Sequence, residues 1–300
     1  MKKLAAILAI VCYCGVTPAR AAEQPNSPRR IVSLSPNLTE ITFALGLGDR
    51  VVAVSNNCDW PAETKHKPKV GTFWQPNVEA IIAVKPDLVV CESFPQQKEV
   101  AATLSRVGLN VLSLRVETID ELFSAIAQIG HAADCSTSAE RLAADVNDRL
   151  SQIRAMCSPA KKVKTLWVMQ TEPLRVAGVN TFVNEVIELT GGQNAIAPTI
   201  DQYPSIGTEE ILSCGAEVII QSAMGTEDIP KQQAAAEKFW SKFANLPAVK
   251  NKGIYVIDPD MVLRLGPRLP QGTQTVARLL HPELFAHPQE PNQGRGRKDD

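Results

Sequence analysis

The 300-residue sequence has no excess of charge of either sign, few aromatic residues and no long apolar run outside its first residues. Its 31 basic and 32 acidic residues nearly cancel, so composition gives no reason to expect nucleic acid or an anionic membrane as a partner. Beyond the start of the chain, no segment offers the roughly 18 uninterrupted apolar residues of a membrane-spanning helix. Aromatic residues make up only 5% of the chain, so any local concentration of them is informative.

The sequence also lacks the usual catalytic and metal-binding motifs. It contains no G-x-S-x-G elbow, no phosphate-binding loop and no G-x-G-x-x-G after a predicted strand. The histidines show no metal-ligand spacing; they are His66, His131, His281 and His287. Acidic residues are numerous, but no pair is singled out as a hydrolase would require. The sequence therefore predicts no enzyme, no metal site and no cofactor, and an exported α/β enzyme is kept as the less favoured alternative.

The first residues have the features of an export signal. A basic start is followed by an apolar run over Leu4–Val16 and by an A-x-A cleavage site at Ala19–Ala21. We therefore expect residues 1–22 to be a signal peptide and the mature protein to be exported and soluble. Cys12 or Cys14 could carry a lipid anchor, but the large residues before them and the A-x-A site favour simple cleavage.

Five cysteines follow the predicted signal: Cys58, Cys91, Cys135, Cys157 and Cys214. An odd number allows at most two disulfides, and the absence of a C-x-x-C pair or regular spacing indicates neither a disulfide framework nor a zinc site. Most of them are interpreted as small buried hydrophobic residues. A bridge between Cys58 and Cys91 stays conceivable, because each follows a predicted strand.

Two segments of the chain, NVEAIIAVKPDLVV at 77–90 and GTEEILSCGAEVII at 207–220, repeat one pattern at an offset of 130 positions. Each copy predicts a short helix, a breaker and a buried strand. The same offset pairs Glu79 with Glu209 and Phe73 with Tyr203. Two such units predict two similar lobes, and a cleft between similar lobes is a common ligand site.

Short β-branched runs alternate with helical segments in both halves of the chain, which is typical of parallel βαβ units. Strands are expected at 31–34, 51–55, 88–90, 111–114, 165–169, 218–221 and 254–257. Between the halves, an apolar stripe predicts a helix from 138 to about 156, roughly 30 Å long, which would act as a rigid spacer. The predicted fold is therefore α/β, with two lobes built on central parallel sheets and joined by one long backbone helix.

The predicted boundaries follow from this pattern. The N-terminal lobe is expected at 23–135, the linking helix at 136–160, the C-terminal lobe at 161–285 and a disordered tail at 286–300. The tail is assigned from its Gly-Arg-Gly-Arg run and its charged end.

The candidate ligand contacts follow predicted strands, because open parallel sheets bind ligands beyond the carboxyl ends of their strands. The turns before the two repeated helices add Phe73, Trp74 and Tyr203. The aromatic and apolar candidates are Trp60, Phe73, Trp74, Phe94, Tyr203 and Met224, and the charged candidates are Arg115, Arg175, Asp260 and Arg264. A single aromatic residue is as often a core residue as a ligand contact, but the coincidence of several at strand ends favours one cleft.

The charged candidates have two interpretations. Arginines are usually solvated or paired with an acid, and Asp260 lies one helical turn from Arg264. Together with Arg268, however, Arg115, Arg175 and Arg264 could donate paired hydrogen bonds to an anionic ligand.

Glu79 and Glu209 also have two interpretations. An acid in the first turn of a helix is favoured by the helix dipole and by free backbone N–H groups. Because the two positions are equivalent, the pair could instead present one negative charge per lobe to a two-fold symmetric partner.

The segments RIVSLSPNLTEITFALGLGDRVVAVS, CDWP and VGTFWQPNVEAIIAVKPDLVV resemble those of the class III substrate-binding proteins of ABC importers. The resemblance covers residues 30–282, and the D-W-P and F-W-Q-P-N-V-E blocks are most similar to cobalamin-binding periplasmic proteins. It implies two Rossmann-like lobes on one backbone helix, which capture a metal-chelate nutrient without turnover. The nutrient would be cobalamin or a related corrinoid, or alternatively a ferric siderophore or haem. The protein would be a monomer when free and would deliver its ligand to a permease dimer.

The resemblance also implies roles for single residues. Trp60, Phe73 and Tyr203 would flank a corrin face, and Asp260 and Arg264 would complete the site. Glu79 and Glu209 would engage arginines of the paired membrane subunits. Two features depart from the cobalamin pattern: Arg115 and Arg175 replace uncharged or acidic residues, and Thr190 replaces a disulfide cysteine. Extra arginines suit an anionic ferric siderophore or a modified corrinoid as well as cobalamin.

Overall fold

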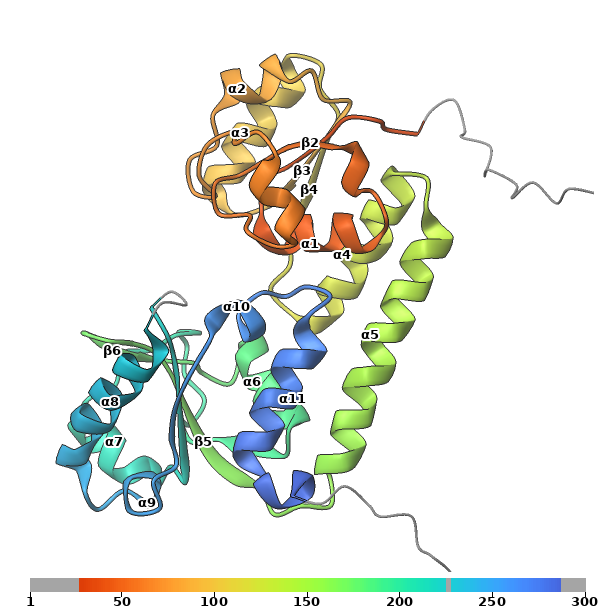
Figure 1. Ribbon diagram of the computed structural model, residues 1–300. Coiled ribbons are helices and arrows are strands. Elements are labelled where there is room, and N and C mark those ends of the chain that lie inside the picture. Colours follow the sequence, from red (N-terminus) through yellow and green to blue (C-terminus); the bar gives the residue numbers. More distant parts are fainter. Residues whose placement is uncertain (1–26, 225–227, 287–300) are drawn as a thin grey trace, which may run out of the picture.

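The structure is a computed structural model that describes residues 27–224 and 228–286, arranged as two α/β lobes beside one long helix (Figure 1). The predicted signal peptide lies outside the described residues, and so does the predicted tail apart from Ala286. Within the described residues, no helix combines the length and the apolar character that crossing a membrane would require.

The first lobe is built on a four-stranded sheet in the order β2-β1-β3-β4, in which every strand is parallel to its neighbours. Its strands are β1 (Ile31–Ser33), β2 (Val51–Val54), β3 (Leu88–Glu92) and β4 (Val111–Leu114). Its helices are α1 (Pro36–Ala44), α2 (Val78–Ala83) and α3 (Pro95–Arg106), with 3₁₀ helices at Gly48–Arg50 and Ala62–His66. Val89 faces α2 and α3, whereas Leu88 and Val90 face α1, because successive strand residues point to opposite sides.

The second lobe is built on a sheet in the order β6-β5-β8-β9, and β7 also pairs with β5. Its strands are β5 (Val163–Thr171), β6 (Leu174–Val176), β7 (Gly192–Asn194), β8 (Val218–Ser222) and β9 (Ile254–Ile257). Its helices are α6 (Phe182–Leu189), α7 (Thr208–Cys214), α8 (Ile229–Trp240), α9 (Pro247–Lys250), α10 (Pro259–Val262) and α11 (Leu269–Leu280). Two 3₁₀ helices lie at Ser241–Phe243 and Pro282–Phe285. All pairs are parallel except β5 with β6, which are antiparallel.

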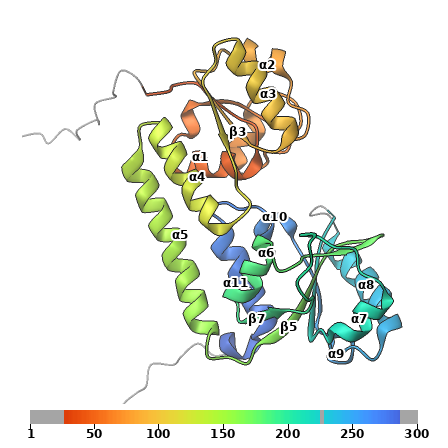
Figure 2. The same cartoon turned by 180° about the vertical axis from the view of Figure 1, so that it is seen from behind.

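Two helices connect the lobes: α4 (Ile119–Ala132) and α5 (Ser136–Cys157). The longer helix, α5, packs against α4 beside the first lobe and against α6 and α11 in the second. Figure 1 and Figure 2 both show α5 alongside the two lobes, on the side away from α2 and α7. Its buried residues Val146, Leu150 and Ile153 belong to the apolar stripe that predicts this helix.

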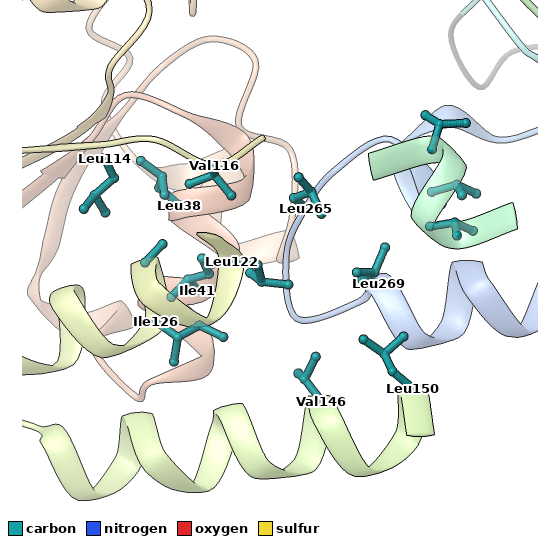
Figure 3. Close-up of a cluster of buried hydrophobic side chains, with 14 of the residues drawn as sticks. Leu38, Ile41, Leu114, Val116, Leu122, Ile126, Val146, Leu150, Leu265 and Leu269 are labelled. Atoms are coloured by element: carbon teal, nitrogen blue, oxygen red, sulfur yellow. The ribbon is translucent and has the colours of Figure 1, made fainter. Parts of the chain in front are cut away.

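The two lobes also share a continuous hydrophobic core, which is broader than the single spacer helix expected from the sequence. Leu38 of α1 and Leu122 of α4 belong to the same cluster of buried side chains as Leu150 of α5 and Leu269 of α11 (Figure 3). Each lobe adds a smaller core on the far face of its own sheet. The lobes are therefore packed together through α4, α5 and α11 instead of being held apart by one helix.

The observed elements differ from the expected ones in one respect that affects the site. The sequence places Arg175 after the first strand of the second lobe, whereas the structure includes it in the antiparallel strand β6. Strands β6 and β7 have three residues each and are defined by their pairing with β5, so their own sequences carry too little pattern to predict them.

Candidate functional site

A cleft of about 650 Å³ lies between the two lobes. It is lined by Pro36, Asn37, Asn56, Asn57, Asp59, Phe73, Glu92, Val116, Phe182, Asp260, Leu263, Arg264 and Leu265. Most of these residues follow the carboxyl ends of β1, β2, β3 and β9, where the backbone leaves the sheet and side chains can converge. The cleft therefore occupies the position predicted for a ligand site.

An aromatic cluster borders the cleft, and we call it the aromatic wall. Its member Phe73 lines the cleft, and the Phe73 ring centroid lies 4.9 Å from that of Trp74 and 4.8 Å from that of Phe94. The loop is fixed because the Phe73 amide donates to the Asn57 side chain at 2.8 Å and its carbonyl accepts from the Gln97 amide at 2.9 Å. Trp74 is 60% exposed, which leaves a flat apolar surface available for a ligand. Three of the predicted aromatic residues are thus brought together.

A cluster of arginines and carboxylates crosses from one lobe to the other beside the cleft. Arg264 binds Asp59 at 2.5 Å, Asp260 at 2.8 Å and Glu40 at 3.5 Å. Arg268 binds Glu40 at 2.6 Å, and its guanidinium lies 4.8 Å from the centroid of the Trp60 ring, within cation–π range. Glu40 and Asp59 belong to the first lobe and both arginines to the second. We call these five charged residues the inter-lobe ion cluster.

The inter-lobe ion cluster sets the charge of its members. Burial acts to raise the pKa of Asp59, but the hydrogen bonds and charge of Arg264 outweigh burial and hold that pKa below its usual value. Burial raises the pKa of Asp260, which also faces Asp59, although Arg264 opposes the shift. Arg264 is thus neutralised by carboxylates of its own protein and has little remaining capacity for an anionic ligand.

Glu92 is a cleft residue that the sequence-based site assignment missed. It ends β3, lines the cleft and forms no ion pair among the described residues. Burial, together with the charge of Glu117, raises the pKa of Glu92 to about 7, although a hydrogen bond with Asn37 opposes the shift. Its place at the end of a buried strand is the same signal that identified the aromatic candidates.

Seven of the ten predicted ligand contacts are not among the residues that line the cleft: Trp60, Trp74, Phe94, Arg115, Arg175, Tyr203 and Met224. Arg115 is exposed and binds Glu117 at 2.8 Å and Glu121 at 3.2 Å. Arg175 is also exposed, and its Nε donates to the Tyr203 carbonyl at 3.1 Å. Tyr203 is partly buried against the shared core, and Met224 is 81% exposed. Their assignment as ligand contacts stays a prediction.

The two repeated glutamates lie on the corresponding short helices of the two lobes. Glu79 is in the first turn of α2 and Glu209 in the first turn of α7, and both are exposed. Within the described ranges 27–224 and 228–286, neither carboxylate forms an ion pair. Their predicted role in docking is not tested by this geometry, but both charges are accessible.

All five cysteines of the described residues are free, so the conceivable bridge between Cys58 and Cys91 does not form. The Cys58 sulfur instead lies 3.1 Å from the hydroxyl oxygens of Thr39 and Ser55. Burial raises the pKa of the Cys58 thiol, and it raises that of Cys91 to about 11. These thiols are buried packing residues, as expected for most of them.

Comparison with known proteins identifies the family. The family described as periplasmic binding protein matches residues 31–261. The chain is 31% identical over 265 residues to the uncharacterized ABC transporter substrate-binding lipoprotein YvrC of Bacillus subtilis (strain 168), covering 86% of this chain and 82% of that protein. It is 27% identical over 245 residues to the vitamin B12-binding protein of Vibrio parahaemolyticus serotype O3:K6 (strain RIMD 2210633), covering 81% and 86%.

Solved structures show the same fold. A possible iron-binding protein from Staphylococcus epidermidis ATCC 12228 has a TM-score of 0.76 at 27% identity, covering 85% of this chain and 99% of that one. The periplasmic vitamin B12 binding protein BtuF of Vibrio cholerae has a TM-score of 0.73 at 26% identity, covering 87% and 99%. The periplasmic heme-binding protein RhuT from Roseiflexus sp. RS-1 has a TM-score of 0.74 at 26% identity, covering 85% and 99%.

These matches confirm the predicted fold of two α/β lobes with mainly parallel sheets. They also confirm the prediction that the chain is not an enzyme, since the family consists of extracytoplasmic proteins that bind substrates for transport. The chain belongs to the periplasmic binding protein family, the substrate-binding proteins of ABC transporters.

Proposed function

We propose that this protein captures cobalamin or a related corrinoid in the inter-lobe cleft and delivers it to the membrane permease of an ABC importer. The cleft combines the aromatic wall around Phe73 with the side-chain amides of Asn37, Asn56 and Asn57. A corrinoid is a large rigid macrocycle with amide side chains, so it offers apolar faces to the rings and hydrogen-bonding groups to the asparagines. A rigid ligand also loses little conformational entropy on binding.

The observation that carries this proposal is the charge of the cleft. Its lining contains the carboxyl groups of Asp59, Glu92 and Asp260 but a single cation, Arg264, among the described residues. That cation already binds Asp59 and Asp260. An anionic ferric siderophore or a haem with its carboxylates would meet net negative charge there, whereas cyanocobalamin has no net charge and avoids this repulsion.

The alternative ligand is a ferric siderophore or haem. It is supported by the solved relatives named for iron and haem binding, which share the fold at similar identity to the vitamin B12-binding one. Arg115 and Arg175 were the sequence features that suggested an anionic ligand. In the structure, Arg115 is paired with two carboxylates and neither arginine lines the cleft, which lowers the weight of this alternative.

We further infer that the mature protein is a periplasmic monomer without a lipid anchor and that Glu79 and Glu209 dock it to the permease. The export signal in residues 1–22 and its A-x-A site support cleavage. One relative is named a lipoprotein, so the alternative is anchoring through Cys12 or Cys14. Mass spectrometry of the mature protein would decide between a cleaved amino terminus and an acylated cysteine.

A ligand titration tests the proposal. Cyanocobalamin, haemin and several ferric siderophores would be titrated into the purified mature protein while tryptophan fluorescence is followed, with free tryptophan as the control for light absorption by the ligand. We expect saturable quenching by cyanocobalamin, most of which is lost when Trp60 and Trp74 are both replaced with phenylalanine, because these two are exposed whereas Trp167 and Trp240 are fully buried. Saturable quenching by haemin or a siderophore alone would refute the corrinoid assignment.

A double variant separates the two ligand classes further. Because Arg115 and Arg175 do not line the cleft, replacing both with alanine should leave the affinity for cyanocobalamin unchanged within about twofold. A loss of affinity for a ferric siderophore or haemin of tenfold or more in the same variant, about 1.4 kcal/mol, would show that these arginines bind an anionic ligand and would favour the alternative.

A further inference from the structure

Each of the two repeated helices exposes one aliphatic side chain beside its glutamate. Ile82 in α2 is 40% exposed and Leu212 in α7 is 54% exposed. They lie three residues after Glu79 and Glu209 respectively, and residues three apart are neighbours on a helix surface. Each helix therefore presents a carboxylate and an aliphatic side chain next to each other.

These two aliphatic residues do not anchor their helices to the lobes. Each helix is anchored by the preceding residue, Ile81 in α2 and Ile211 in α7, which are 0% and 3% exposed. The anchors belong to the separate cores of their lobes. Ile82 and Leu212 thus point away from the apolar side of helices that are already packed.

The two exposed positions are also equivalent in the repeat. Of the nine large hydrophobic residues that are exposed in the described part of the chain, Ile82 and Leu212 are the only two related by the offset of 130 positions. Scattered single exposed hydrophobic residues are normal on a protein surface and need no explanation. Ile82 and Leu212 differ from such scattered residues, because each lies beside one of the two repeated glutamates. The same combination of charge and apolar surface therefore occurs in both lobes.

We propose that Glu79 with Ile82, and Glu209 with Leu212, form two docking patches that together bind the paired membrane subunits of the importer. This inference rests on the proposed function and adds to it the apolar half of the interface. Each membrane subunit would present a basic side chain beside an apolar surface, once per patch. Two similar patches on one chain match a partner with two-fold symmetry, in which the same surface occurs twice.

The glutamate and the aliphatic residue of each patch contribute differently to docking. The glutamates have no ion partner within residues 27–224 and 228–286, so each is free to attract a cation and to set the orientation of the complex. An exposed ion pair alone contributes little because water screens it. An aliphatic side chain that packs against the partner beside the pair excludes water from it and adds its own burial. The pair of Ile82 and Leu212 therefore supplies affinity where the glutamates supply orientation.

Both patches lie where a single partner could reach them. Helices α2 and α7 are in different lobes, and both lie on the side of the molecule away from α5 (Figure 1 and Figure 2). The lobes are joined by the shared core and by the inter-lobe ion cluster, so the spacing of the two patches is fixed before docking. A fixed spacing reduces the entropy lost when both patches bind at once.

Uptake of cobalt-57-labelled cyanocobalamin tests the inference. Source cells that lack the gene would express the full-length protein or a variant at equal level, and the initial uptake rate would be measured. Burial of a half-exposed aliphatic side chain predicts a loss of about fivefold for Ile82→Ser or Leu212→Ser, about 1 kcal/mol each, and a larger loss for the double variant. The conservative variants Ile82→Leu and Leu212→Ile should retain uptake, because the patch stays apolar.

The control is Met156→Ser in α5, since Met156 is 42% exposed, similar to Ile82, but has no repeat partner among the exposed residues. All variants must bind cyanocobalamin with unchanged affinity in the fluorescence titration, which separates docking from ligand capture.

Uptake by the serine double variant at the rate of Met156→Ser would overturn the docking patches while leaving the transport function intact. Failure of the unaltered protein to restore uptake would instead refute the proposed function. A dimer in solution that the double variant abolishes would assign the patches to self-association and also overturn the inference.

Discussion

Replacing Glu40 with glutamine should cost more stability than any other single change to an acidic side chain near the cleft. The Glu40 side chain is 2% exposed, and it binds both Arg264 and Arg268, whose side chains are 17% and 19% exposed. Removing one partner from a buried ion pair typically costs about 3–5 kcal/mol, because the remaining charge is left without compensation. Glutamine keeps the volume of the side chain but removes the negative charge.

The structure places the expected cost at the lower end of that range. Arg264 would keep Asp59 and Asp260, so only Arg268 would lose its carboxylate partner. Arg268 also contacts the Trp60 ring, and the glutamine oxygen could still accept one hydrogen bond. We therefore expect a loss of about 3 kcal/mol in the free energy of unfolding and a fall of about 6 °C in Tm.

Urea unfolding followed by circular dichroism measures this loss, with Glu99→Gln as the matched control on an exposed position of α3. The control should change the free energy of unfolding by less than about 0.5 kcal/mol. A double-mutant cycle with Arg268→Gln should give a coupling energy above about 1 kcal/mol. If Glu40→Gln is no more costly than Glu99→Gln, the desolvation of the cluster cancels its attraction, and the reasoning that it joins the lobes is wrong.

Three further predictions follow from the cleft, the thiols and the connection between the lobes. Because burial raises the pKa of Glu92 from 4.5 to about 7, the stability that its bound proton provides is complete below pH 4.5 and is lost as pH rises through 7. As pH rises from 4.5 to 8, Glu92→Gln should therefore become more stable relative to the unaltered protein, by up to about 3 kcal/mol. Urea unfolding at several pH values measures this, and a difference in the free energy of unfolding that does not change with pH would contradict this pKa. Reducing agent should leave Tm unchanged, and a thiol reagent should reach Cys58 and Cys91 only after unfolding; fast reaction in the native protein would contradict their burial. Spin labels at Lys98 in α3 and Lys238 in α8 should keep their distance when cyanocobalamin binds, and a shift of several ångströms would show lobe closure instead.

Elements whose signal is local could be predicted from the sequence. β4 (Val111–Leu114) and β9 (Ile254–Ile257) have the bounds that their apolar runs predict, because a glycine or polar residues interrupt the pattern on either side. The long helix α5 (Ser136–Cys157) begins two residues before and ends one residue after the stretch from 138 to about 156 that its apolar stripe predicts, because the stripe marks only the buried face of the helix.

The candidate site also contains features that the sequence could predict and features that it could not. The aromatic wall was predictable because Phe94 follows a strand and Phe73 and Trp74 lie in the turn before a repeated helix, in a chain with few aromatic residues. The pair of Arg264 with Asp260 was predictable from helical spacing and is present at 2.8 Å. The partners of Arg268 and Arg264 in the other lobe could not be predicted, because Glu40 and Asp59 are 228 and 205 positions away in the chain. No local pattern encodes such contacts, and they determine whether an arginine is free to bind a ligand.

The shared core and the inter-lobe ion cluster together argue for a cleft that is formed before the ligand arrives. Closing the lobes by a hinge would require the shared hydrophobic core to repack, and it would pull Glu40 away from Arg268 in a largely buried setting. Both changes cost several kcal/mol, which a ligand could offset only through interactions made in the closed state alone. A protein built in this way gains most from a ligand that is itself rigid and large enough to touch both lobes of an open cleft. This is a further physical reason, independent of charge, to favour a macrocycle over a small flexible ligand.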